Sequence, residues 1–564
     1  GELLMIDELR DLITTERARF GVPGVAVAVV LDGEVVLCEG FGHADLDTGA
    51  PVGADTHFPI ASDTKAFTAA VTCLLADDGL IDLDAPVRDV LPWFAMHDPH
   101  ATDLVTPRDL LSHRTGLPRH DLVWFGDTPM SLEETTRGLR HLPSSRPVRT
   151  AWDYNNLCYI AAGHLTEVVT GTPWPDAVRS LLLDPLGMTS TGFAVQDAVV
   201  DRPAQPYKAT PTGFARQALP ARATARKAGP AGGLVSTAAD LARWLLARLG
   251  AHPDVLSPST VDQLHRPAML GGITPDLFEE ITSLGYALGC QVESYRGTRI
   301  VHHGGNTLGY SSDVCVVPDS RIGVAVLTNL DGSYLRLPLV YSIIDRLHGN
   351  AEAHWGKRIH ALQTAVDTGH DEAREHHRAR ASAASPSRPF TGFAGTYSHP
   401  AYGDLVIRVE DDGLVPDFHD AGDRVRLDHR GHDAWDLVFV EDEVTCPLVF
   451  TQDLDGSVTG LVVATEPAVG PAIFARRPEP VPAELLAAMV GTYRMGPMTL
   501  VVRGRADGLV ASSSALGDLV LTGAGGTSFR CPAMPGVGVT ADLDPDGAVA
   551  RIVVDTVGIF VPEA

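Results

Sequence analysis

The chain has 564 residues, more than one hydrophobic core can organise, so we expect it to divide into several domains. Its composition is globular, with 45% hydrophobic and 20% charged residues. The formal net charge of −27 argues against nucleic acid and against an anionic membrane surface as partners.

The sequence also bears on the compartment of the protein. It contains no run of 18 apolar residues, and its first 21 residues have the pattern of an amphipathic helix rather than of a secretion signal. The seven cysteines are scattered and mostly set in apolar strings, which indicates reduced core residues. We therefore expect a cytoplasmic protein, with a leader that was removed earlier as the alternative.

After the first helix come two β-rich runs joined by Asp32-Gly33, a pair typical of a two-residue hairpin. Predicted helices follow, and then strand-like runs at 300–318 and 322–330 and a helix at 337–348. Strands at both ends with helices between them predict one α/β domain, residues 1–350. We expect its first and last strands to share an antiparallel sheet.

The segment Ser62-Asp63-Thr64-Lys65 stands at the start of the apolar run AFTAAVTCLLADDG. If this run is helical, Ser62 and Lys65 share one face of the first turn. A lysine amine that burial keeps neutral can take the proton of a serine hydroxyl, whereas an arginine cannot. Only four of the 44 basic residues are lysines, which makes this spacing more informative. The alternative is a serine N-cap followed by a surface lysine.

A second motif, Tyr154-Asn155-Asn156, supplies a phenol and an amide. The phenol of Tyr154 can lose its proton beside cations, and the amide of Asn156 can position an amine or bind a substrate amide. The alternative is a turn with a buried tyrosine.

A third motif, His303-Gly304-Gly305-Asn306, lies on a predicted edge strand. Its glycines would let a substrate backbone come close and pair with the strand beside the imidazole. The alternative is a β-bulge with a packed histidine.

Residues 351–390 are rich in Ala, Arg, Glu and His, which predicts a solvated helix and linker. His376 and His377 lie in this segment, but consecutive residues of a helix point apart, so we do not expect them to bind a metal together.

The remaining residues are β-rich and contain a repeat. Gly395-Thr396-Tyr397 recurs as Gly491-Thr492-Tyr493, and Asp412-Gly413-Leu414 recurs as Asp507-Gly508-Leu509. Two such copies predict two small antiparallel β-barrels that arose by duplication. The corresponding domain boundaries are 391–480 and 481–564. Neither copy contains a convincing catalytic cluster.

The three motifs together resemble those of the penicillin-recognising serine hydrolases, which include class C β-lactamases, DD-carboxypeptidases, esterases and D-aminopeptidases. The pattern of that family is Ser-x-x-Lys, then Tyr-x-Asn, then Lys-Thr-Gly or His-x-Gly. Its matches here follow in the same order. The resemblance covers residues 5–350 and implies a β-lactamase/transpeptidase-like α+β fold, with an antiparallel sheet flanked by helices. The two trailing barrels are similar to the lipocalin-like barrels of D-aminopeptidases.

The resemblance implies that Ser62 forms an acyl-enzyme and that Lys65 and Tyr154 act as a coupled base, with Tyr154 also protonating the leaving group. His303 would tune Tyr154 and line the site. The family also implies an oxyanion hole from the backbone N–H groups of Ser62 and Asn306, and substrate contacts from Asn156, Gly304 and Gly305. No metal or other cofactor is implied.

One departure lies in the third motif, where carboxypeptidases and β-lactamases have a lysine that helps to hold a substrate carboxylate. His303 is mostly neutral at pH 7, which weakens the case for β-lactam or C-terminal carboxylate substrates. We therefore expect a serine hydrolase that cleaves an amide, peptide or ester bond, with D-configured residues among the candidate substrates. A small molecule, a peptide or a peptidyl ester would be its partner, and the sequence does not predict an oligomeric state.

Two alternatives remain open. An acyl transferase or peptide cyclase of the same fold would use the same residues, because an amine instead of water can resolve an acyl-enzyme. A non-catalytic sensor would keep the acyl group, and a binding protein would rely on its barrels. The sequence contains no Gly-x-Ser-x-Gly, His-Glu-x-x-His or phosphate-loop motif, which argues against an α/β-hydrolase or a metalloprotease.

Overall fold

The computed structural model forms two compact units, the first with residues 1–379 together with 466–470 and the second with residues 380–465 and 471–564. Among the described helices, none combines the length and the apolar character that a bilayer crossing requires. The structure describes residues 2–127, 130–219, 228–272, 277–411, 413–441, 443–454, 456–505 and 508–563.

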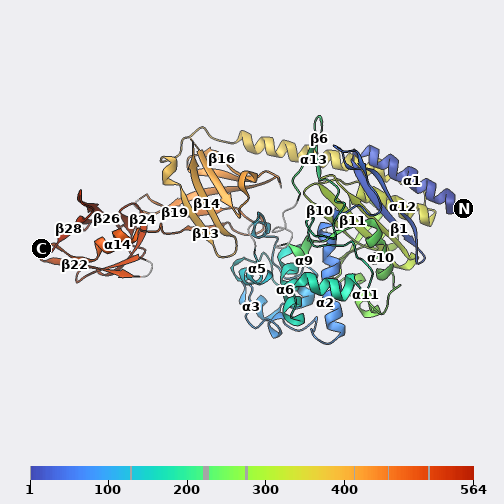
Figure 1. The fold of residues 1–564 in the computed structure, drawn as a ribbon, viewed down its shortest axis with the longest axis horizontal. Helices are drawn as coiled ribbons and strands as arrows, with labels where there is room; N and C mark the ends of the chain where they lie inside the picture. The colour runs from blue at the N-terminus through green and yellow to red at the C-terminus, as the bar shows by residue number, and fades with distance from the viewer. Residues whose placement is uncertain are drawn as a thin grey trace. The chain divides into compact units, whose positions relative to one another are not determined.

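An eight-stranded antiparallel sheet forms the centre of the first unit (Figure 1). Strand β1 pairs with β2 on one side and with β12 on the other, so the first and last strands share the sheet as predicted. The predicted hairpin is confirmed, because Asp32 and Gly33 join β1 to β2 with positive φ angles of 49° and 87°. In spatial order the strands are β3 (Ala50–Pro51), β2 (Glu34–Asp45), β1 (Gly24–Leu31), β12 (Ile322–Thr328), β11 (Tyr310–Val317), β10 (Thr298–Thr307), β9 (Gln291–Tyr295) and β8 (Ile281–Tyr286).

Helices cover both faces of this sheet. Successive residues of a strand point to opposite sides, and β12 is buried along its whole length, so both of its faces are packed. In β12, Val324 and Val326 belong to the core that contains residues of α1 and α12, whereas Gly323 lies against Leu245 of α10. The described helices of the first unit are α1 (Glu2–Arg19), α2 (Thr64–Asp77), α3 (Pro99–Leu104), α4 (Pro107–Leu111), α5 (Leu132–Gly138), α6 (Asn156–Thr170), α7 (Trp174–Val178), α9 (Gly229–Gly232), α10 (Ala238–Arg248), α11 (Pro258–His265), α12 (Arg336–His348) and α13 (Trp355–Ala379).

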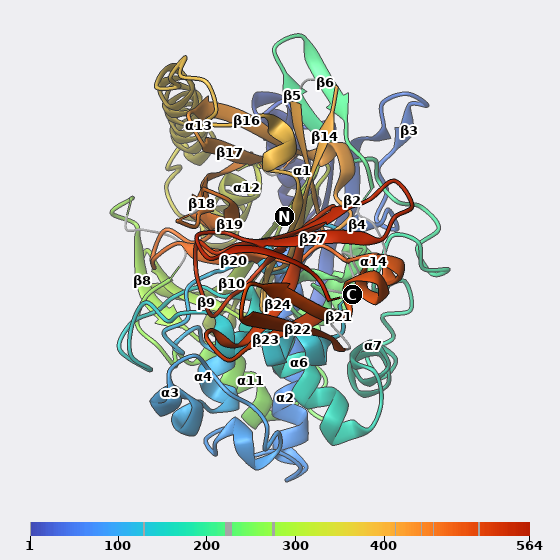
Figure 2. The same cartoon turned by 90° about the vertical axis from the view of Figure 1, so that its left-hand side faces the viewer.

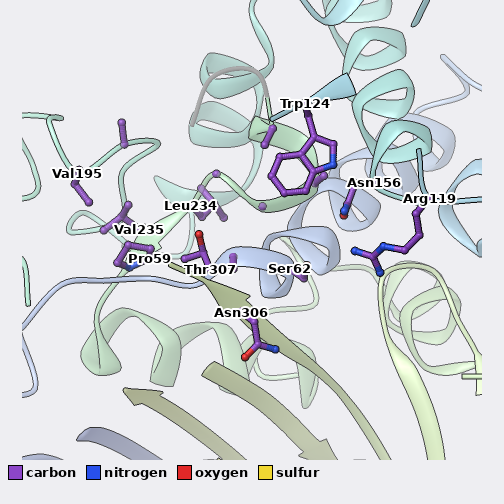
Figure 3. Close-up of a pocket in the computed structure, with 16 residues that line it drawn as sticks. Pro59, Ser62, Arg119, Trp124, Asn156, Val195, Leu234, Val235, Asn306 and Thr307 are labelled. Carbon is purple, nitrogen blue, oxygen red and sulfur yellow. The ribbon is translucent and has the colours of Figure 1, made fainter. Parts of the chain in front are cut away.

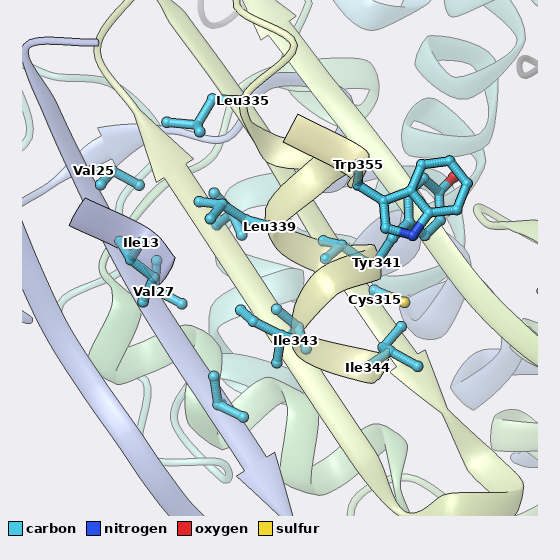
Figure 4. Packing of buried hydrophobic residues seen from close by; sticks show 14 of the residues in the cluster. Ile13, Val25, Val27, Cys315, Leu335, Leu339, Tyr341, Ile343, Ile344 and Trp355 are labelled. Carbon is cyan, nitrogen blue, oxygen red and sulfur yellow. The ribbon is translucent and has the colours of Figure 1, made fainter. Parts of the chain in front are cut away.

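The core under α1 and α12 combines branched aliphatic residues with stacked aromatic rings (Figure 4). Trp355 is 1% exposed, and its indole N–H donates a hydrogen bond to the hydroxyl of Tyr295 at 2.8 Å. Its ring centroid lies 5.1 Å from that of Tyr341. The polar atom of this large side chain is therefore satisfied inside the core. Trp355 anchors the first turn of α13, whose later turns are mostly exposed, as expected for residues 351–390.

A two-stranded hairpin, β5 (Tyr207–Thr210) and β6 (Gly213–Arg216), projects from the first unit (Figure 2). Strand β6 is exposed along its length. Tyr207 at the base is buried, and its hydroxyl accepts a hydrogen bond from the backbone N–H of Leu46 at 2.8 Å. The hairpin is thus attached to the sheet region through its base.

The second unit contains two eight-stranded antiparallel sheets, which confirms the predicted barrel architecture. Strands β21 to β28 close into a barrel through the pairing of β21 with β28. In the first sheet the described strands run in the order β15-β14-β13-β20-β19-β18-β17-β16, which leaves a seam between β15 and β16. Its bounds are β13 (Gly395–His399), β14 (Gly403–Glu410), β15 (Gly413–Phe418), β16 (Val425–Gly431), β17 (Ala434–Phe439), β18 (Val444–Gln452), β19 (Val458–Val463) and β20 (Ala472–Arg476). The closed barrel follows α14 (Ala483–Met489) with β21 (Gly491–Met495), β22 (Met498–Arg505), β23 (Gly508–Ser513), β24 (Gly517–Gly525), β25 (Ser528–Arg530), β26 (Gly538–Leu543), β27 (Val549–Val554) and β28 (Gly558–Pro562).

The sequence repeat corresponds to the same local structure in both sheets. Tyr397 and Tyr493 occupy the third position of β13 and β21, and both are buried. Each hydroxyl donates to the carbonyl four residues earlier, Phe393 at 2.6 Å and Met489 at 3.0 Å. Asp412 and Asp507 of the second repeated triplet lie outside the described residues. The shared tyrosine contact supports an origin by duplication.

We expect Trp355→Ala to lower the free energy of unfolding of the first unit by about 3–5 kcal/mol, because it empties a large core volume and removes the hydrogen bond to Tyr295. Urea unfolding followed by circular dichroism measures the change. Leu80→Ala is the control: Leu80 is 55% exposed, so its replacement should change stability by no more than about 0.5 kcal/mol. Equal midpoints for the two variants would contradict the prediction.

Candidate active site

Ser62 lies in a short 3-10 turn, η1 (Ala61–Asp63), directly before α2. Ala61 has a φ of 45°, a left-handed conformation that costs a non-glycine residue about 1–3 kcal/mol. The turn is held from the sheet, because the hydroxyl of Ser312 on β11 donates to the carbonyl of Ile60 at 3.0 Å. This contact fixes the backbone from which the Ser62 side chain projects.

The strand that carries the third motif is not an edge strand, so that prediction is wrong. β10 is third from one end of the sheet, because β9 and β8 extend the sheet beyond it. However, β9 begins at Gln291, which pairs with His302. From His303 to Thr307 the described pairing of β10 is with β11 alone. A short stretch of backbone edge therefore lies beside the turn that carries Ser62.

The two glycines of this motif have a packing role in the structure. A Cβ atom on Gly305 would overlap the carbonyl oxygen of Ile60 and the hydroxyl of Ser312. A Cβ atom on Gly304 would lie 2.7 Å from the guanidinium of Arg336. Glycine at position 305 therefore lets β10 approach the turn that carries Ser62. Whether these glycines also admit a substrate backbone stays a prediction.

The amine of Lys65 is fully buried and has three uncharged hydrogen-bond partners. Its Nζ atom lies 3.1 Å from Ser62 Oγ, 2.8 Å from Asn156 Oδ1 and 2.7 Å from the backbone oxygen of Ala231. The structure thus brings together the first two motifs, which are about ninety residues apart in the sequence.

Burial, helped by the nearby cation of Arg119, holds the pKa of Lys65 well below its ordinary value. A neutral amine has two N–H groups and one lone pair. The oxygens of Asn156 and Ala231 can accept only, so they take the two N–H groups. The lone pair is left for the hydroxyl proton of Ser62.

Tyr154 also contacts Ser62, but as a hydrogen-bond donor. Its hydroxyl donates to Ser62 Oγ at 2.8 Å, and burial raises the pKa of Tyr154 well above its ordinary value. The guanidinium of Arg119 lies 4.9 Å from the centre of its ring, but this cation does not offset the loss of solvation. The phenol therefore keeps its proton. This geometry suits Lys65 as the proton acceptor and Tyr154 as the proton donor.

The position of Tyr154 and Asn156 follows from a helix cap. Asn155 is the N-cap of α6, and its side-chain oxygen accepts the backbone N–H of Cys158 at 2.9 Å. The backbone N–H of Asn155 donates to Nδ1 of His113 at 3.0 Å. The centre of the His113 imidazole lies 4.4 Å from the centre of the Tyr154 phenol ring. The cap places Asn156 in the first turn of α6, from which it reaches Lys65.

Adjacent histidines on β10 have opposite environments because they point to opposite faces of the sheet. Burial lowers the pKa of His302, but Asp313 and Glu293, each 3.2 Å away, outweigh burial and raise it to about 10. Burial and the nearby Lys65 instead hold the pKa of His303 well below its ordinary value. His303 Nδ1 donates to the carbonyl of Gly304 at 2.7 Å, and its ring centre lies 6.1 Å from that of Tyr154.

A cavity of about 150 Å³ opens beside Ser62 (Figure 3). Pro59, Val195 and Val235 lie on one side of Ser62, and Asn156 and Arg119 lie on the other. Its remaining walls are formed by Ala61, Trp124, Ala194, Ala228, Ala231, Gly232, Gly233, Leu234, Asn306 and Thr307.

Sequence reasoning missed Arg119 and Trp124, because neither belongs to a recognisable motif. Among the residues that the structure describes, no group of three or more His, Cys, Asp or Glu side chains is arranged to hold a metal ion.

The fold and this arrangement of serine, lysine and tyrosine define a serine hydrolase of the β-lactamase type. Residues 9–339 match the family model described as Beta-lactamase, so the chain belongs to the β-lactamase family and the predicted family resemblance is confirmed. Residues 379–471 match a second model, described as a domain of unknown function (DUF3471).

Three known proteins illustrate the relationship. The chain is 32% identical over 477 residues to an unguisins hydrolase of Aspergillus campestris, covering 80% of this chain and 88% of the relative. It is 31% identical to penicillin-binding protein 4 of Amycolatopsis lactamdurans, covering 56% of this chain and 82% of the relative. The solved D-amino acid amidase of Ochrobactrum anthropi superposes with a TM-score of 0.50 and 25% identity, covering 61% of this chain and 99% of the amidase.

The lowered pKa of Lys65 predicts the pH dependence of acylation. Only the neutral amine can accept the serine proton, so the rate constant for labelling by a phosphonate probe should fall as pH drops through the lowered pKa. Above that pKa the rate should be flat, well before the ordinary lysine value of about 10.4. Lys65→Arg should not be labelled at any pH, because guanidinium keeps its proton. A rate that still rises up to pH 10 would show that Lys65 is protonated in the resting protein.

Proposed function

We propose that the protein is a hydrolase that forms an acyl-enzyme on Ser62 and cleaves an amide or peptide bond. The observation that carries this proposal is the position of Ser62 Oγ, 3.1 Å from the buried amine of Lys65 and 2.8 Å from the hydroxyl of Tyr154. A nucleophile with an acceptor on one side and a donor on the other can lose and regain a proton without moving.

In acylation, Ser62 Oγ attacks the substrate carbonyl carbon while its proton passes to Lys65. The backbone N–H groups of Ser62 and Asn306 would bind the resulting oxyanion, and both residues line the cavity. The C–N bond then breaks as Tyr154 gives its proton to the leaving nitrogen. Lys65, whose Nζ lies 4.8 Å from the centre of the Tyr154 ring, returns its extra proton to the phenolate.

In deacylation, water attacks the acyl carbon and gives its proton to Lys65. The bond between the acyl carbon and Ser62 Oγ breaks, and the serine regains a proton from the lysine. The neutral His303 lines this region without supplying a charge. Asn156 holds the Lys65 amine throughout and is available to a substrate amide.

Two relatives support amide chemistry and a choice of first substrates. One is named as a hydrolase of unguisins and the other as an amidase of D-amino acids. We therefore propose D-amino acid amides and peptides that contain D-residues as the substrate class. Arg119 and Asn156 on one side of Ser62 and apolar side chains on the other can take the polar backbone and an apolar side chain of such a substrate.

We expect wild-type protein incubated with a phosphonate probe to gain one adduct mass on the peptide that contains Ser62, and Ser62→Ala to gain none. The D- and L-enantiomers of phenylalanine amide, assayed for ammonia release, test the proposed chirality. An adduct on another residue would refute the nucleophile. Labelling at Ser62 with faster turnover of the L-enantiomer would refute the substrate class only.

Tyr154→Phe should lower kcat by about 100- to 1,000-fold with little change in KM, because the variant loses the donor to the leaving group but keeps the ring. Steady-state kinetics with the amide substrate measure this split. An ester with a p-nitrophenolate leaving group needs no protonation, so its turnover should suffer less. Undiminished amide turnover by this variant would show that another group is the acid.

A further inference from the structure

One carboxylate outside the three motifs contacts three side chains that line the cavity. Asp121 begins the short turn η3 (Asp121–Val123), and its side chain is 20% exposed. Its Oδ1 atom accepts the indole N–H of Trp124 at 2.9 Å and Nδ2 of Asn156 at 3.2 Å. Its Oδ2 atom accepts Nε of Arg119 at 2.5 Å.

The contact with Asn156 determines which way that amide faces. A carboxylate can only accept hydrogen bonds, so Asn156 must turn its NH2 group toward Asp121. Its oxygen then faces Lys65 and accepts an N–H of the amine. With the amide reversed, the NH2 group would compete for the lysine lone pair that has to accept the serine proton. The orientation set by Asp121 therefore keeps this lone pair available.

The other two contacts shape the substrate cavity. Arg119 is about half exposed, and its guanidinium points into the cavity next to Ser62 (Figure 3). The Nε bond to Asp121 and the ring of Tyr154 hold it from two sides. Trp124 forms a wall of the same cavity, with its indole nitrogen bonded to Asp121. Asp121 thus links two side chains of the cavity wall to Asn156, the hydrogen-bond partner of Lys65.

We propose that Asp121 is a positioning residue for the reaction, which acts on proton transfer through the orientation of Asn156 and on substrate binding through Arg119 and Trp124. This inference rests on the proposed function of Ser62 and Lys65. It extends that function by a residue that touches neither the nucleophile nor the cavity.

Charge at position 121 also acts on Lys65. Asp121 favours the protonated amine, as does Asp63, whereas Arg119 opposes it. The other groups that face this amine are the neutral side chains of Ser62, His113, Tyr154, Asn156, Tyr159 and His303. The acid limb of the acylation rate is the range in which the rate falls as pH drops through the pKa of Lys65. Removal of the Asp121 charge should therefore shift this acid limb to lower pH. A purely structural role would not produce this shift.

The test compares Asp121→Asn with wild type in the full-length protein, with the phosphonate labelling rate measured across pH. We expect a labelling rate constant on the pH plateau that is about ten- to a hundred-fold lower, and an acid limb moved to lower pH. Asp84→Asn is the matched control, because Asp84 is a surface aspartate that binds Arg108 at 2.6 Å, away from the cavity. This control should label as wild type does.

A double-mutant cycle tests whether Asp121 acts through Asn156. In the Asn156→Ala background, Asp121→Asn should cause almost no further loss in the plateau rate constant. If the two losses multiply, the proposed route through Asn156 is wrong. Labelling of Asp121→Asn at the wild-type rate with an unshifted limb would also overturn the proposal.

Asp121→Glu covers the case in which Asp121→Asn does not fold. It keeps the charge but moves the carboxylate, so it should lower the plateau rate and leave the acid limb in place. Wild-type labelling by Asp121→Glu would overturn the positioning role. The proposed function is tested by a different result: it is wrong if the adduct on the wild-type protein maps to a residue other than Ser62.

Discussion

The amine of Lys65 is enclosed by uncharged hydrogen-bond partners, and the chemistry of the site depends on this environment. A buried ammonium without a paired carboxylate is costly, and this cost holds the pKa of Lys65 well below its ordinary value. The two carbonyl-type oxygens beside it accept N–H groups of the amine, so in its neutral form the lone pair faces Ser62. The proposed role of Lys65 as a base therefore depends on the exclusion of solvent from this one atom.

The turn that carries Ser62 is held by the sheet rather than by its own helix. Ala61 has a left-handed backbone conformation that costs free energy, and the contacts of Ile60 with β10 and β11 maintain it. Gly305 is needed at this contact because any side chain would overlap the backbone of Ile60. The same strand presents His303 to the site and His302 to a buried cluster of carboxylates on the other face. Strand alternation therefore separates a charged structural histidine from a neutral one at the site.

Charge in the site is arranged at two distances from the serine. Lys65 and Tyr154 are the two groups in hydrogen-bond contact with Ser62. Burial lowers the pKa of the Lys65 amine and raises the pKa of the Tyr154 phenol, so it favours the uncharged form of both. The charged pair Arg119 and Asp121 lies one contact further out and acts on the lysine in opposite directions. In the proposed mechanism the groups that transfer the proton start uncharged, while the charges of Arg119 and Asp121 act on the pKa of Lys65.

Much of this protein follows from short-range patterns in the sequence. The spacing of Ser62 and Lys65, the Asp32-Gly33 hairpin and the duplicated Gly-Thr-Tyr triplets depend on neighbouring residues, and the structure shows the corresponding local contacts. The position of β10 inside the sheet, the pKa shifts of Lys65 and Tyr154, and the contacts of Asp121 were decided by tertiary structure alone. Strand order, solvent exclusion and contacts between distant side chains arise from segments that meet only when the chain is folded, and no local pattern records them.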